Sequence, residues 1–252
     1  MKLPEYLKTL GEAPLPKLNV KNELERIRND PLNSLISRLH GKLGDKVADS
    51  TDLYQRAYHF YYQSVERLLP DVSLARRWRN GPYYAERDEM RMPREWVGLA
   101  HRYRAIANHI DFDFDNFVIH SRIMLDRAIG LSKYFLDGGH LPSFNSFNRH
   151  RKFVIEENRF GNIEYARYFR AKTGWFEVLR EVRDKYVVHP NRAGLHTWGL
   201  FKGDEFVYAF FTAVTTGSGK AEPRAFLLGT HRLIRQVDGF LRWFAKYGTA
   251  RV

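Results

Sequence analysis

The stretch FVIHSRIMLDRAIGLSKYFL, residues 117–136, decides the fold class more than any other part of the chain. Apolar and small residues recur in it at alternating steps of four and three, which places them on one face of an α-helix. They are Phe117, Ser121, Met124, Ala128, Leu131 and Phe135, flanked by Val118, Leu125, Ile129 and Leu136. We therefore expect a long helix that buries this face and ends at Asp137-Gly138-Gly139.

The chain before this helix predicts further helices. Residues 1–22 hold three prolines and little periodicity, so we expect an irregular arm. Helical patterns follow over 21–43 and again where Leu53, Ala57, Phe60, Ser64 and Leu68 share a face, with Ser50 or Thr51 as a candidate cap. Residues 70–93, rich in arginine and aromatic side chains, are expected to form a charged connector.

An acidic run, DFDFDN at 111–116, stands between a helical pattern over 95–109 and the long helix. It resembles the start of a calcium-binding EF-hand loop, but Asn116 occupies the position of the required Gly and Arg122 that of the required Glu. The run is better explained as a helix N-terminus, where acidic side chains are favourable. We accordingly predict an N-terminal arm and helical extension over 1–110 and a main domain over 111–252.

Shorter helices are expected beyond the long one. One covers about 143–157, where Arg149, His150 and Arg151 are expected to form a basic cluster, and another begins after Asn162. A third carries Trp175, Leu179, Val182, Tyr186 and His189 on one face and ends at Pro190.

The pattern then changes from helix to strand. Aromatic and β-branched runs at 196–201 and 205–211 flank Lys202-Gly203-Asp204, which predicts a β-hairpin at about 196–214. The segment TTGSGK at 215–220 lacks the spacing of a phosphate-binding loop and is expected to be a flexible loop. A final helix is predicted with Ile234, Val237, Leu241 and Phe244 on its buried face. The predicted fold class is mainly α, with this hairpin inserted before the last helix.

Composition limits the function. The 252 residues include 41 Lys and Arg against 29 Asp and Glu, a formal charge of +12 that favours a polyanionic partner, nucleic acid first. There is no cysteine, which excludes thiol nucleophiles, disulfides and cysteine-based metal sites. No apolar run is long enough to span a membrane and the start lacks a signal-peptide pattern, so we expect a cytoplasmic protein.

The best candidate for chemistry is the segment RDKYVVHP, residues 183–190. The most economical route to a phosphodiester reaction that uses neither thiol nor metal is a His as general base or acid beside an Arg that stabilises the phosphate. Arg183 and His189 are such a pair, but on a regular helix two residues six apart point about 120° apart. The helix must therefore loosen before His189, as the following Pro190 favours.

The segment resembles the signature of the HEPN family, in which an Arg, commonly followed by a polar residue, precedes a His by four to six residues. Residues 118–135, with Asp126 inside an apolar face, resemble the long first helix of that family, and the similarity covers roughly residues 111–247. The resemblance implies a HEPN-like helical bundle. It departs at Asn191, where family toxins regulated by nucleotidyl transfer carry Tyr, so that regulation is not expected.

The resemblance implies a metal-independent endoribonuclease without cofactors. Arg183 and His189 would act at the scissile phosphate with Asp184 positioning them, and attack by the ribose 2′-hydroxyl would leave a 2′,3′-cyclic phosphate. RNA contacts are expected from Lys185, Arg180, Asn191 and Arg192. A homodimer is expected, with a role as a toxin or anti-phage effector held in check by an antitoxin or another regulatory partner.

Other interpretations remain open. Since His189 continues an apolar stripe, it is also explained as a core residue, and Arg183 as an exposed cation favoured by the helix dipole. In that case the chain would be a non-catalytic helical module that binds RNA or a protein, or a sensor of small nucleotides.

Overall fold

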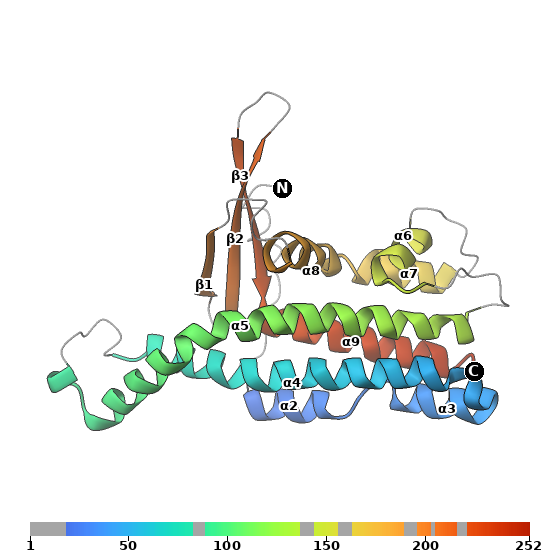
Figure 1. The fold of residues 1–252 in the computed structure, drawn as a ribbon, viewed down its shortest axis with the longest axis horizontal. Coiled ribbons are helices and arrows are strands. Elements are labelled where there is room, and N and C mark those ends of the chain that lie inside the picture. Colours follow the sequence, from blue (N-terminus) through green and yellow to red (C-terminus); the bar gives the residue numbers. More distant parts are fainter. Residues whose placement is uncertain are drawn as a thin grey trace. The chain divides into compact units, whose positions relative to one another are not determined.

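A computed structural model describes residues 19–82, 89–136, 144–155, 163–188, 196–202, 205–215 and 221–252. Most of these residues are helical, and one small sheet precedes the last helix (Figure 1). The α-helices are α2 (Val20–Arg28), α3 (Asn33–Leu43), α4 (Ala48–Arg79), α5 (Arg94–Gly130), α6 (Phe147–Ile155), α7 (Ile163–Lys172), α8 (Trp175–Val182) and α9 (Thr230–Thr249). The strands are β1 (His196–Lys202), β2 (Glu205–Thr215) and β3 (Ala221–Gly229). The predicted fold class, mainly α with strands inserted before the last helix, is confirmed.

The chain divides into two compact units, each assembled from three separate segments. The first unit takes the described residues within 1–24, 63–118 and 182–232, and the second takes those within 25–62, 119–181 and 233–252. Helices α4 and α5 each contribute to both units. The predicted domains stay a prediction, although α5 passes without a break through the proposed boundary at residue 110.

The apolar stripe of 117–136 is confirmed, because every position named for it is at most 7% exposed. The helix is nevertheless longer than predicted and ends earlier, at Gly130, where a 3-10 turn (Leu131–Tyr134) takes over. In the second unit, the core beside it is aromatic. Phe147 of α6 lies with its ring 4.5 Å from Phe176 of α8 and 5.0 Å from Phe240 of α9. The predicted buried face of α9 is confirmed as well.

The prediction that the acidic run 111–116 begins a helix is wrong, because the run lies inside α5. Ile110, Phe114 and Phe117 are all buried and follow one another at steps of four and three, so a single apolar face continues through the acidic residues. The burial of this face affects the acidic side chains beside it. Burial, together with the neighbouring Asp111, raises the pKa of Asp115 to about 6.

The predicted connector over 70–93 is wrong for its first part, because α4 continues through Pro70 to Arg79. A proline in a helix interior removes one backbone hydrogen bond, a cost of about 3 kcal/mol. In the first unit, the turns beyond Pro70 bury Trp78, whose ring lies 6.4 Å from Trp96 and 6.2 Å from Tyr103. Burial of this apolar cluster stabilises the part of α4 that continues beyond Pro70. The proposed caps are also wrong, since Ser50 and Thr51 lie inside the helix.

The stripe predicted on the first half of α4 is partly wrong. Leu53 and Phe60 are 46% and 52% exposed, whereas Tyr54, Tyr58 and Tyr61 are buried. Buried tyrosines need partners for their hydroxyl groups. The Tyr54 hydroxyl donates to Asp30 Oδ1 at 2.7 Å and the Tyr58 hydroxyl to the carbonyl oxygen of Ile27 at 2.6 Å.

The single helical pattern over 21–43 is two helices, α2 and α3. The break falls at Asp30-Pro31, where Asp30 Oδ1 accepts the N–H of Leu32 at 2.8 Å and so stabilises a turn. Gly44 ends α3 with φ at +57°, a left-handed conformation that favours glycine.

The predicted hairpin is confirmed, and a third strand extends it. Strands β1 and β2 are antiparallel, with Lys202 opposite Glu205. Strand β3 pairs with the other side of β2, so the sheet order is β1-β2-β3 (Figure 1). No strand is predicted over 221–229, and Pro223 lies within β3. A proline is tolerated there because β3 is an edge strand of the sheet.

The predicted basic cluster at 149–151 is wrong for two of its three residues. His150 is fully buried, and its Nε2 shares a hydrogen bond of 2.9 Å with the Tyr165 hydroxyl. Arg151 is paired with Glu177 and also donates to Thr173 Oγ1 at 3.0 Å. These side chains contribute to the interior of the second unit and not to a basic surface.

Candidate functional site

The helix that carries the Arg183 segment changes its geometry where the motif begins. Regular α-helix ends at Val182, and Arg183–Val187 form a π turn. The backbone N–H of Val188 donates to the carbonyl oxygen of Arg183 at 2.9 Å, five residues back instead of four. The prediction that the helix loosens before His189 is confirmed for the described residues. Such π turns occur frequently at functional sites.

Arg183 and Asp184, two of the three predicted catalytic residues, form an ion pair. Arg183 Nη1 donates to Asp184 Oδ1 at 2.8 Å. Both side chains are about two-fifths exposed, at 37% and 43%, so the pair contributes little to stability. The Asp184 carboxylate restricts the orientation of the Arg183 guanidinium. Solvent reaches this guanidinium, so a ligand can reach it as well.

Arg180, predicted to contact RNA, is held by carboxylates. Its Nε donates to Glu177 Oε2 at 3.1 Å, and its Nη2 to Glu181 Oε1 at 3.3 Å. Arg151 pairs with Glu177 from α6. A phosphate contact by Arg180 would therefore compete with two carboxylates that already neutralise its charge.

The remaining predicted site residues stay predictions. The backbone of Lys185 lies in the π turn, but its side chain is outside what the structure describes. His189, Asn191 and Arg192 lie outside the described residues. Of the predicted catalytic residues, Arg183 and Asp184 contact each other in the described part of the chain.

Two further findings concern the described part of the chain alone. Its His, Asp and Glu side chains form no group of three or more with the arrangement that a metal ion needs. Its helices include none with the length and apolar character required to cross a bilayer.

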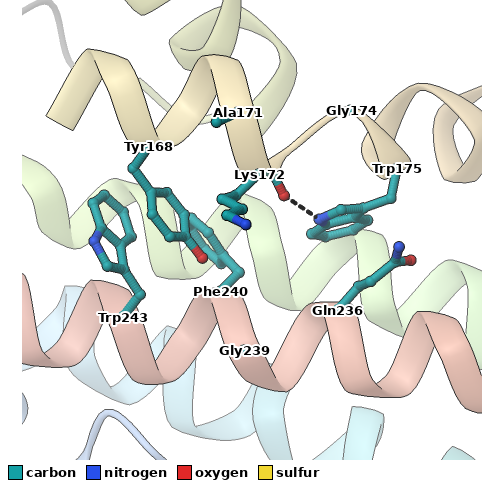
Figure 2. Close-up of a pocket in the computed structure, with 9 residues that line it drawn as sticks. All are labelled: Tyr168, Ala171, Lys172, Gly174, Trp175, Gln236, Gly239, Phe240 and Trp243. Atoms are coloured by element: carbon teal, nitrogen blue, oxygen red, sulfur yellow. Dashed lines mark hydrogen bonds between the residues drawn. The ribbon is translucent and has the colours of Figure 1, made fainter. Parts of the chain in front are cut away.

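A pocket between α7 and α9 of the second unit was missed by the sequence interpretation (Figure 2). Four of its nine lining residues are aromatic, and the lining residues are Tyr168, Ala171, Lys172, Gly174, Trp175, Gln236, Gly239, Phe240 and Trp243. The only signal in the sequence is the density of aromatic residues near 165–176 and 240–247. That signal also describes a buried core, and the pairing of two segments so far apart cannot be read from local patterns.

Comparison of the chain with family models, with curated proteins and with solved structures found no match. The resemblance to the HEPN family therefore depends on the residues quoted for it above.

Proposed function

We propose that the chain is a metal-independent endoribonuclease of the HEPN type, acting through Arg183, Asp184 and His189. The observation that carries the proposal is the π turn over Arg183–Val187. On a regular helix the side chains of residues 183 and 189 would diverge. A π turn that starts at the motif Arg changes this spacing, and such turns occur frequently at functional sites, which supports a functional reason for it.

In the proposed reaction, His189 accepts the proton of a ribose 2′-hydroxyl, and the 2′-oxygen attacks the adjacent phosphorus. The bond from phosphorus to the 5′-oxygen breaks, and that oxygen takes up a proton as it leaves. The products are a 2′,3′-cyclic phosphate and a 5′-hydroxyl. Arg183 stabilises the negative charge that develops on the phosphate, and the 2.8 Å ion pair with Asp184 positions the guanidinium.

The excess of 41 basic over 29 acidic residues supports a polyanionic substrate. A chemistry that uses the 2′-hydroxyl cuts RNA and spares DNA. As an effector of this kind the protein would be a toxin or act against phage, and an antitoxin or another regulatory partner would restrain it.

We also propose a homodimer, in which two motifs line one cleft. Separately from that cleft, large apolar side chains exposed on the second unit favour a contact between two copies there, while Arg183 and Asp184 belong to the first unit. Leu53 and Phe60 of α4 and Ile123 of α5 are 46%, 52% and 43% exposed. The Phe60 ring stacks on His120 at 5.7 Å, which brings the faces of α4 and α5 together. A monomer by light scattering at micromolar concentration would contradict this interface.

The pocket between α7 and α9 favours a second candidate function, a non-catalytic module that binds RNA or a nucleotide. Its aromatic side chains are suited to a planar ligand, and the lining residues that the structure describes include neither Arg183 nor Asp184. Binding of RNA with no cleavage by any form of the protein would favour this candidate.

The decisive test compares purified wild type with His189→Ala and Arg183→Ala on end-labelled RNA in EDTA. We expect wild type to leave cyclic-phosphate ends, and each variant to cleave at least 100-fold more slowly. Arg56→Ala is the matched control, because Arg56 is a 71% exposed arginine paired with Asp52 on α4. Unchanged cleavage in His189→Ala would exclude the proposed mechanism.

A further inference from the structure

The pocket between α7 and α9 has the size of a site for a small molecule or for one chemical group of a larger ligand. Its volume is about 530 Å³, within the range of roughly 300–1,000 Å³ found for ligand pockets. It lies wholly in the second unit, so its geometry belongs to one compact part of the chain.

Two fixed aromatic surfaces form the sides of the pocket (Figure 2). On one side Tyr168 stacks on Trp243, with ring centroids 3.5 Å apart and planes 1° from parallel. Trp243 is anchored in turn by Tyr165, at 5.3 Å between centroids. On the other side the indole N–H of Trp175 donates to the carbonyl oxygen of Lys172 at 2.8 Å, which fixes its ring plane. Rings that are already ordered lose little entropy when a planar ligand stacks on them.

Polar groups of two kinds accompany these rings. Gln236 of α9 supplies an amide with both donor and acceptor atoms, which can pair with the edge of a base. Lys172 of α7, an exposed residue, supplies an ammonium group suited to a phosphate. No carboxylate is present among the lining residues that the structure describes. The site therefore favours a planar ligand with hydrogen-bonding edges and a negative charge.

We propose that this pocket binds an unpaired nucleobase of single-stranded RNA by stacking. Aromatic side chains stack on bases of any sequence, and a nearby cation contacts the backbone. A base inside a duplex is covered on both faces by its neighbours and cannot enter. The choice of RNA rests on the proposed function, but binding at this pocket requires neither Arg183 nor His189.

The experiment measures binding of a fluorescent 12-nucleotide RNA whose 2′-hydroxyls are all methylated. Such an RNA cannot be cleaved through the 2′-oxygen, so affinity is separated from catalysis. Anisotropy titrations compare wild type with Trp175→Leu and Lys172→Glu. We expect Trp175→Leu to weaken binding about tenfold, equivalent to about 1.4 kcal/mol, and Lys172→Glu to weaken it by a similar factor.

Matched controls account for changes in folding and in net charge. Phe112→Leu removes an aromatic ring that is 63% exposed on α5, and Lys246→Glu reverses an exposed charge near the end of α9. We expect both controls to bind within twofold of wild type. Lys172 is exposed, so its variant keeps the test valid if Trp175→Leu fails to fold. With a duplex of the same sequence, Trp175→Leu should bind as wild type does.

The outcomes separate this inference from the proposed function. Pocket variants that bind the methylated strand as tightly as their controls would overturn the nucleobase site, and so would a wild type that does not bind it. Pocket-dependent binding without cleavage of unmodified RNA would support the nucleobase site and contradict the ribonuclease. If the pocket variants cleave unmodified RNA and bind the methylated strand as wild type does, the result would support the ribonuclease and contradict the nucleobase site.

Discussion

At the scale of single residues, His150 shows how a polar side chain can belong to the core. It is fully buried on α6, with Phe144 packed edge-on against its ring at 4.7 Å and the Tyr165 hydroxyl 2.9 Å from Nε2. Burial lowers the pKa of His150 from 6.5 to about 3, so the imidazole stays neutral in the folded protein. In the sequence it stands between two arginines, which is why a basic surface cluster was predicted.

The neutral imidazole makes stability depend on pH. Below pH 6.5 the His150 imidazole binds a proton in the unfolded chain. In the folded chain it stays neutral down to about pH 3. The contribution of His150 is therefore fully present above pH 6.5 and is lost as the pH falls, at a limiting rate of roughly 1.4 kcal/mol per pH unit. We expect urea denaturation of His150→Gln to give a lower free energy of unfolding at pH 7 and a shallower decline from pH 6 to pH 4.

The control for this prediction is His59→Gln, since His59 is exposed on α4. Its decline with pH should stay close to that of wild type. Equal slopes for His150→Gln and wild type would show that the buried histidine does not set the acid sensitivity.

At the scale of elements, the buried face of the second half of α5 and that of α9 were predicted well, because their apolar residues keep a helical period without interruption. The first half of α4 was predicted poorly because its buried face consists largely of tyrosines. A tyrosine is buried only where its hydroxyl finds a partner, and the partners of Tyr54 and Tyr58 lie near residues 27–30, outside the helix. The connection from α5 to α6 depends in the same way on a polar contact.

That contact is made by Asp126 of α5. Its Oδ1 accepts the backbone N–H of Phe147, the first residue of α6, at 2.6 Å and pairs with Arg122 Nη1 at 2.7 Å. Arg122 is 7% exposed and lies over the Phe176 ring at 4.6 Å. One carboxylate thus accepts the first backbone N–H of α6 and pairs with a buried cation.

We expect Asp126→Ala to lower the free energy of unfolding by about 2–4 kcal/mol, because it removes the carboxylate that pairs with the buried guanidinium and the acceptor of the Phe147 N–H. The matched control is Asp52→Ala, which breaks a pair of the same spacing with Arg56 whose side chains are 71% and 55% exposed. Its expected cost is below about 0.5 kcal/mol. Thermal and urea unfolding measure both, and similar losses in the two variants would contradict the role of Asp126.

At the scale of the whole molecule, the excess positive charge is the property that bears on function. An excess of 12 basic over acidic residues attracts any polyanion, whatever the details of the site. Binding of single-stranded RNA releases counterions, with a slope of about −0.7 per phosphate contact in a plot of log affinity against log salt. The charge therefore predicts a strong salt dependence.

For about five phosphate contacts, affinity for single-stranded RNA should fall roughly 100-fold between 50 and 200 mM salt. A peptide nucleic acid of the same base sequence has no phosphates and should show almost no salt dependence. Anisotropy titrations in a salt series measure both ligands. An RNA affinity that stays constant over this range would show that the positive charge has no part in binding.

Some properties of this protein follow from the sequence by itself. The helical class, the buried faces of α5 and α9, the hairpin and the loosening of the helix at Arg183 are set by residues within a few turns or one short loop of each other. Local backbone geometry is enough to predict them, because an apolar period or a turn pair acts on its own neighbourhood.

Tertiary structure alone decided the rest. The length of α4 past Pro70, the third strand, the burial of His150 and the aromatic pocket between α7 and α9 all depend on partners distant in the chain. A polar or aromatic side chain is stable inside a protein only where a specific hydrogen bond or ring contact offsets its desolvation. That offset is a property of the neighbours that folding brings together, such as Tyr165 for His150 and Tyr168 for Trp243.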